Sequence, residues 1–202
     1  MKLTITSQAY FSHPRTMSNK ALRQQVKDDF DVAVRRMDNF TLSGLAAIAK
    51  LNLDIANPEK VSLVSCAPYF SVELVQKLII DCQNGKSIRP LDFVSTVGNA
   101  ANFYIAKEFE IHGSNLFLGA GTNAIDKALM VSAIELASKV QQKVVILFWQ
   151  ETPTERSCYA MLAENPVEEI APIVTDLSFE NISQASYTIP YTLDLQHKLA
   201  SF

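Results

Sequence analysis

Three short apolar runs stand out along the chain, at residues 61–66, 114–118 and 144–149. All three are rich in side chains that favour strands, and runs of this length bounded by turn residues are typical of buried strands. Residues 3–8 and 186–195 instead alternate apolar and polar side chains, which predicts two half-buried strands near the ends of the chain.

Between these strands, apolar side chains recur at three- and four-residue spacing, the pattern of an amphipathic helix. Such helices are predicted around residues 18–34, 40–50, 71–85, 95–105 and 125–140. In the third of them, Ser71 is a suitable N-cap and Gly85 a suitable terminator. Its expected core face consists of Val72, Val75, Leu78, Ile79 and Cys82. Strands that alternate with helices predict an α/β fold with at least some parallel pairing.

The segment from Thr152 to Phe179 breaks this alternation. It is polar and contains Pro153, Pro166 and Pro172. Because proline fixes φ and removes a backbone donor, this composition predicts a loop region with little regular structure.

The composition fits one globular domain, since the 202 residues are 48% hydrophobic and 19% charged. The net charge of −3 gives no general attraction to nucleic acid or to an anionic membrane. The longest apolar run, Val144 to Trp149, is too short for a membrane span, and residues 1–6 lack the apolar core of a signal peptide. The three cysteines follow no metal-binding spacing, so a cytoplasmic protein with reduced thiols is expected.

The most distinctive stretch joins the run at 114–118 to the helix that begins near Ile125. Gly119 and Gly121 permit a tight turn between them, so the order is strand, glycine turn and helix N-terminus. Proteins of the α/β class commonly hold a nucleophile or an anion at such a junction. Leu118 stands where the reactive side chain is expected, and leucine has no such chemistry.

The same turn, Gly119-Ala-Gly121-Thr-Asn-Ala124, fits the G-x-G-x-x-[GA] dinucleotide fingerprint. That fingerprint normally opens a βαβ unit and is followed about 20 residues later by an acidic residue for the ribose. Here secondary structure is predicted before the strand, and the candidate acid, Glu151, follows only after about 30 residues. A nucleotide-binding small-molecule enzyme is therefore an alternative to glycines that serve the turn alone.

No other group of reactive side chains indicates a site. Cys82 is expected in the core, Cys158 in an exposed loop, and Cys66 as a small core side chain at the end of a strand. The histidines are far apart in the sequence, so no metal site is expected. They are His13, His112 and His197.

Basic side chains near the N-terminus alternate with acidic ones and are expected to form a solvated face. A docking patch for an acidic carrier protein is the more specific alternative. These residues are Arg15, Lys20, Arg23, Lys27, Arg35 and Arg36.

Four segments resemble, in the same order, the N-terminal half of a β-ketoacyl synthase, the condensing enzyme of fatty-acid and polyketide synthesis. Residues 36–40, Arg-Met-Asp-Asn-Phe before an alanine-rich helix, are similar to the family's R-R-M-D-R-F. Residues 89–100, Arg-Pro-Leu-Asp-Phe-Val-Ser-Thr-Val-Gly-Asn-Ala, are similar to its S-P-x-x-F-x-x-S-V-x-N-A. His112-Gly113-Ser114 resembles the G-P-S before the nucleophile strand, and residues 118–125 resemble the nucleophile elbow C-A-[ST]-G-x-x-A-I.

The resemblance implies the N-terminal half of a thiolase-like fold, with a mixed sheet and helices packed on its faces. A single half domain is expected over residues 1–202, with a ketosynthase-like core at 35–150 and a proline-punctuated segment and last strand at 151–202. The family's nucleophilic cysteine corresponds to Leu118. Its two catalytic histidines and its lysine belong to a C-terminal half that this chain is expected to lack.

Inactive copies of this kind are chain length factors, which pair with an active synthase and help to shape its acyl tunnel. The shortest ones resemble only the N-terminal half and occur with aryl polyene synthesis, and this sequence resembles those most. The resemblance implies a heterodimer with a full-length ketosynthase, an acyl carrier protein acting through the complex, and neither cofactor nor metal. A homodimeric scaffold without a tunnel role is a further alternative.

Condensing enzymes pair the strand before the nucleophile with its mate, so residues 114–118 are expected to form an open edge in the isolated chain. The residues that the resemblance places at the tunnel or the interface are Pro68, Tyr69, Phe70, Phe93, Phe103, Ser114, Asn115, Leu116, Phe117 and Leu118.

Overall fold

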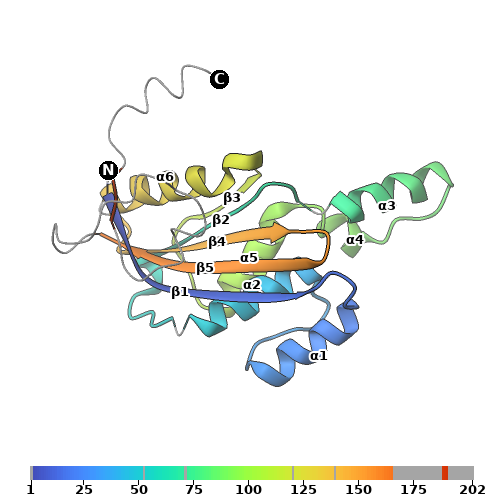
Figure 1. Cartoon of the computed structure of the whole chain (residues 1–202), viewed down its shortest axis with the longest axis horizontal. Helices are drawn as coiled ribbons and strands as arrows, with labels where there is room; N and C mark the ends of the chain where they lie inside the picture. Colours follow the sequence, from blue (N-terminus) through green and yellow to red (C-terminus); the bar gives the residue numbers. More distant parts are fainter. Residues whose placement is uncertain are drawn as a thin grey trace, which may run out of the picture.

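The computed structural model describes residues 2–51, 53–70, 72–119, 121–138, 140–165 and 188–190. These residues form a mixed six-stranded sheet in the order β3-β2-β4-β5-β1-β6, with helices on both faces (Figure 1). The predicted α/β fold with a mixed sheet and helices packed on its faces is confirmed.

The parallel half of the sheet is formed by the three apolar runs of the sequence. β2 (Val61–Ala67) lies between β3 (Asn115–Gly119) and β4 (Lys143–Glu151), and both neighbours run parallel to it. Every residue of β2 is buried, as expected of a strand covered on both faces. The three predicted strands are confirmed.

The antiparallel half contains a strand that was not predicted. β5 (Glu155–Glu164) pairs with β4 and with β1 (Lys2–Pro14), whose outer neighbour is β6 (Thr188–Pro190). The expectation of an irregular segment from residue 152 is therefore wrong for residues 155–164. The exposed thiol expected at Cys158 is wrong too, since Cys158 is buried within β5. Residues 166–179, the rest of the segment expected to be irregular, lie outside the described residues. So do residues 186–187 and 191–195 of the predicted last strand, of which β6 is the described part.

One face of the sheet is covered by α2 (Asn39–Lys50), with α1 (Asn19–Asp29) and α5 (Gly98–Glu108) beside it. Asp38 caps α2 by accepting a hydrogen bond from the Thr41 backbone at 2.7 Å. Residues 41–48 are all buried, because α2 has neighbours on all sides. The other face is covered by α6 (Ala124–Ala137), which packs its small side chains on β2 and β4. Two short 3₁₀ turns precede β2 and α6, at Pro58–Lys60 and Gly121–Asn123.

α3 (Val72–Gln83) and α4 (Pro90–Val94) project beyond the end of the sheet (Figure 1). The helical pattern in this region is confirmed, but its predicted core face is wrong. Leu78 is buried, whereas Val72, Val75, Ile79 and Cys82 are exposed. The apolar stripe of α3 lies beside α4, with which it lines an open groove. Ser71, the expected cap of α3, lies outside the described residues.

No helix within the described residues is long and apolar enough to cross a membrane.

We expect His13 to make the fold acid-sensitive between about pH 7 and pH 5. Its side chain is 2% exposed, and Nδ1 lies 3.1 Å from the Pro14 carbonyl oxygen, to which it donates in the neutral ring. Burial lowers the pKa of His13 below its ordinary value of 6.5, and the charge of Arg156 lowers it further. The unfolded chain therefore binds more protons below that value, and stability present above it is lost as the pH falls.

Urea unfolding followed by tryptophan fluorescence at a series of pH values measures this loss. In His13→Phe, which has no titrating group at this position, the free energy of unfolding should change less over the same interval. An unchanged slope in this variant would assign the acid sensitivity to other groups.

Candidate functional site

The site is the elbow between β3 and α6. β3 ends at Gly119, the chain turns through Gly121–Asn123, and α6 begins at Ala124. Gly121 has a φ of +63°, a value that glycine adopts without strain. Its backbone N–H donates to the carbonyl oxygen of Pro68 at 3.2 Å. This bond places the loop after β2 directly beside the elbow, so the predicted residues Pro68 and Leu118 belong to one site.

Leu118, at the nucleophile position, points to the α6 side of the sheet. It pairs in register with Cys66 of β2 and packs on the apolar cluster that contains Cys66 and Ile125. Burial raises the pKa of the Cys66 thiol, and the nearby charge of Asp126 raises it further. The thiol beside Leu118 is therefore held protonated, the opposite of an activated nucleophile.

Phe117 points to the other side of the sheet and belongs to a group of four aromatic rings. Its ring centroid lies 5.0 Å from that of Phe70, which lies 4.6 Å from Phe40, and Phe40 stacks on Trp149 at 4.0 Å. A Cβ at Gly98 would come within 2.2 Å of the Phe117 ring, so glycine is required where α5 meets β3. We call Phe40, Phe70, Phe117 and Trp149 the aromatic cluster.

Buried polar side chains fix β3 against its neighbours. Asn102 of α5 donates from Nδ2 to the Leu116 carbonyl oxygen at 3.1 Å and accepts a hydrogen bond from Ser65 on its Oδ1. On the α6 side, Glu135 accepts hydrogen bonds from the hydroxyls of Ser62 and Ser114. Since these bonds hold the start of β3 from both faces of the sheet, its position at the sheet edge is well defined.

β3 is an edge strand of the sheet formed by the described residues, as the sequence predicted. Leu116 is 37% exposed on it. Beyond the edge, three of the predicted aromatic residues lie on the surface: Tyr69 is 74% exposed, Phe93 61% and Phe103 61%. These fractions exceed what core positions allow, so these three side chains are available to a partner.

The two histidines among the described residues do not converge on the elbow. His112 is exposed, with Nδ1 3.3 Å from Glu59, and His13 is buried in β1. His197 lies outside the described residues. Within the described part of the chain, no three histidine, cysteine or acidic side chains are grouped as metal ligands.

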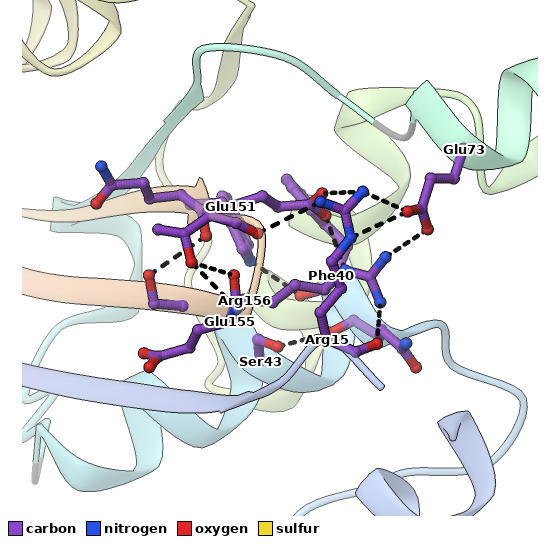
Figure 2. Close-up of polar contacts among 12 residues, drawn as sticks. Arg15, Phe40, Ser43, Glu73, Glu151, Glu155 and Arg156 are labelled. Carbon is purple, nitrogen blue, oxygen red and sulfur yellow. Dashed lines mark hydrogen bonds and ion pairs between the residues drawn. The ribbon is translucent and has the colours of Figure 1, made fainter. Parts of the chain in front are cut away.

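A group of charged side chains joins the start of α3 to the rest of the molecule (Figure 2). Glu73 accepts on Oε1 from Nε of Arg15 at 3.1 Å and on Oε2 from Nη2 of Arg156 at 2.5 Å. Arg156 also donates from Nε to Glu151 at 2.9 Å. The hydrogen bond from Arg15 lowers the pKa of Glu73, and Arg156 lowers it further. We call Arg15, Glu73, Glu151 and Arg156 the Glu73 ion-pair cluster.

This cluster could not be predicted from the sequence, because its members come from the segment after β1 and from α3, β4 and β5, and no local motif links them. The same holds for Asn102, whose partners Ser65 and Leu116 are 37 and 14 residues away in the chain. Gly98 could have been noticed, since it stands in the segment 89–100 that resembles a known family motif, but its ring contact could not.

No protein-family model matches the sequence, and no curated protein sequence matches it significantly. Solved structures do match. One is the ketosynthase ApeO in complex with its chain length factor ApeC from Xenorhabdus doucetiae, with a TM-score of 0.64 and 14% identity over 82% of this chain and 80% of that chain. Another is the ishigamide ketosynthase/chain length factor, with a TM-score of 0.64 and 16% identity over 85% of this chain and 64% of that one.

A β-ketoacyl synthase from Burkholderia phymatum matches with a TM-score of 0.58 and 9% identity, over 82% of this chain and 59% of that one. The chain thus spans less than two thirds of two of these three structures. At such identities the likeness establishes the fold: the predicted thiolase-like ketosynthase fold is confirmed.

Proposed function

We propose that this chain is a cytoplasmic, non-catalytic subunit of the chain-length-factor type, which pairs with an active β-ketoacyl-acyl carrier protein synthase and helps to shape its acyl tunnel. The pathway proposed is aryl polyene or related polyketide synthesis. The observation that carries the proposal is Leu118 at the nucleophile position of an otherwise complete elbow. The fold that surrounds it is shared with ketosynthase–chain length factor complexes.

In this proposal the partner supplies the chemistry. Its cysteine carries the growing chain and condenses it with malonyl units delivered by an acyl carrier protein. This chain contributes the open edge of β3 and the side chains around it. A complex with a pairing partner would also cover an apolar edge that is otherwise an aggregation hazard.

The proposed tunnel wall is the group of predicted residues near the elbow. Pro68 is tied to the elbow by its bond from Gly121, and Phe70 is fixed in the aromatic cluster. Tyr69, between them, is exposed and free to contact an acyl chain or the partner. Phe93 and Phe103 extend the apolar surface onto α4 and α5.

Co-expression with the ketosynthase encoded beside it, followed by size-exclusion chromatography with mass determination, tests the proposal. A one-to-one complex is expected, with this chain self-associated or insoluble when expressed alone. A stable, monodisperse chain that ignores the synthase would contradict the proposal.

Leu118→Cys is expected to give neither condensation nor decarboxylation of malonyl-acyl carrier protein. The new thiol would share the apolar surroundings that raise the pKa of Cys66, so little thiolate would form. His112 precedes β3, with its Nδ1 beside Glu59, whereas Leu118 lies near the other end of this strand, so His112 is not placed to act as its base. Release of carbon dioxide by the purified variant, measured beside an active synthase, checks this, and a rate above background would refute it.

The nucleotide-binding alternative predicts that the glycine turn offers its backbone N–H groups to a phosphate. The N–H of Gly121 instead donates to Pro68, inside the molecule. Thermal stabilisation by a dinucleotide would nevertheless favour that alternative, and none is expected.

A further inference from the structure

α3 exposes a row of large apolar side chains that a solvated helix would not carry. Val72 is 57% exposed, Ile79 53% and Ile80 47%. Between α3 and α4 lies an open groove of about 370 Å³, lined by Val75, Leu78, Ile79, Cys82, Ile88 and Phe93. Contiguous apolar surface of this kind marks an interaction site. We call residues 72–94 the α3–α4 arm.

The arm is continuous with the open edge of β3. α4 leads through Val97, which is 48% exposed, into α5, whose first residue Gly98 lies against the ring of Phe117 in β3. Exposed apolar side chains follow this path from the arm to the edge. They are Phe93, Val94, Val97, Phe103 and Leu116. A protein seated on the β3 edge would therefore meet the arm as part of the same surface.

The size of the arm decides what can occupy it. A helix of 12 residues is about 18 Å long, so one face of α3 offers roughly 200 Å². A stable interface needs about 800 Å² from each partner. The face of α3 is too small to hold a protein by itself, so an occupant needs further surface, and the surface continuous with the arm is the β3 edge.

Ion pairs connect the start of α3 to the rest of the described molecule. Glu73, in the first turn of α3, is bound by Arg15 from the segment after β1 and by Arg156 from β5 (Figure 2). A further ion pair, Lys86 with Asp81 at 3.0 Å, stays within the arm. The Glu73 ion-pair cluster thus connects the start of α3 to β5 and to the segment after β1.

We propose that the α3–α4 arm is a docking arm for the ketosynthase subunit, held at its docking angle by the ion pairs of Glu73 with Arg15 and Arg156. This inference rests on the proposed function and adds to it a surface, α3, and a positioning residue, Glu73. The partner surface that fits the groove is apolar, since the surface that the groove exposes is mainly that of Val75, Leu78, Ile79, Ile88 and Phe93, with Cys82, Gln83 and Thr96 beside them.

The test is a competition inside one cell. Tagged ketosynthase is co-expressed with the wild-type chain and one variant, and intact mass spectrometry gives the ratio of the two chains that co-purify. Each amount is normalised to the soluble amount of that chain in the lysate, so a variant that fails to fold does not count as one that fails to bind.

Ile79→Glu is expected to lower capture by about tenfold or more, because it places a charge in the centre of an apolar contact. Ile134→Glu is the matched control, since Ile134 is 45% exposed on α6 and away from the arm. It should be captured within about twofold of the wild-type chain. Equal capture of Ile79→Glu and wild type would overturn the docking arm. The docking arm would also be overturned if Ile79→Glu changed only the self-association of this chain and not its capture by the ketosynthase.

Glu73→Gln is expected to lower capture by about threefold to tenfold, and to make it less dependent on salt than wild-type capture. Asp81→Asn breaks the ion pair inside the arm and should leave capture unchanged. Equal behaviour of the two variants would overturn the role of Glu73. If the ketosynthase retains no wild-type chain at all, the proposed function itself fails, and that result is distinct from a variant that competes equally.

Discussion

Asn115→Pro should reduce capture by the ketosynthase about a hundredfold or more while leaving the fold of this chain in place. The backbone of β3 explains the expectation. Leu63 donates its N–H to the Ser114 carbonyl oxygen at 2.8 Å, and the Leu116 carbonyl oxygen is bound by Asn102. Because successive residues of a strand direct their backbone groups to opposite sides, those of Asn115 point away from β2 to the open edge.

Proline at position 115 removes the outward N–H and blocks strand addition, yet an edge strand accepts proline where the N–H faces solvent. The same competition with tagged ketosynthase measures the effect. Asn115→Thr keeps the N–H and favours the strand, so it should be captured like the wild-type chain. If Asn115→Pro is also captured like wild type, the β3 edge is not where the two subunits meet.

The parallel core of the fold could be predicted from the sequence because each of its strands is a continuous apolar run. β5 could not. Its alternation is weak, it follows Pro153, and it precedes Pro166, so residues 155–164 had the composition of a loop. The strand forms because β4 and β1 supply partners on both sides, which is information from outside the segment.

Cys82 and Cys158 were both predicted wrongly, in opposite senses, because a sequence pattern does not include the neighbouring elements. Periodicity placed Cys82 on the apolar face of a helix, and that face exists, but in the described molecule it borders an open groove beside α4, and Cys82 is exposed. Composition placed Cys158 in a loop, and pairing within the sheet buries it. A pattern states which side chains favour burial, whereas the element that buries them is set by the tertiary structure or by a partner.

The candidate site was predictable to the extent that it is local in sequence. The elbow, the position of Leu118 and the exposed edge at 114–118 all follow from one stretch and its resemblance to a known family. The Glu73 ion-pair cluster was not predictable, since Glu73 is 58 residues from Arg15 and 83 from Arg156. Long-range charge pairs of this kind leave no periodic signal.

Trp149→Ala should lower the free energy of unfolding by about 3–5 kcal/mol, the cost of removing a large buried aromatic side chain. Trp149 is 4% exposed, stacks on Phe40 and donates from Nε1 to the Phe40 carbonyl oxygen at 3.0 Å. It also lies against Gly44 of α2, where a Cβ would come within 2.7 Å of its ring. Its removal would open a cavity between α2 and the sheet and take away the support of the aromatic cluster.

Trp149→Phe separates the contribution of ring stacking from that of the hydrogen bond, because it keeps a ring for the stack but loses the hydrogen bond. The free energy of unfolding should fall by about 1–3 kcal/mol. Phe103→Ala is the control, since Phe103 is 61% exposed and should change stability by no more than about 0.5 kcal/mol. Trp149 is the single tryptophan of the chain, so urea unfolding must be followed by far-ultraviolet circular dichroism. A loss below about 1 kcal/mol for Trp149→Ala would mean that the cluster does not anchor Phe70, and with it the proposed tunnel wall at Pro68–Phe70 would lose its rigid support.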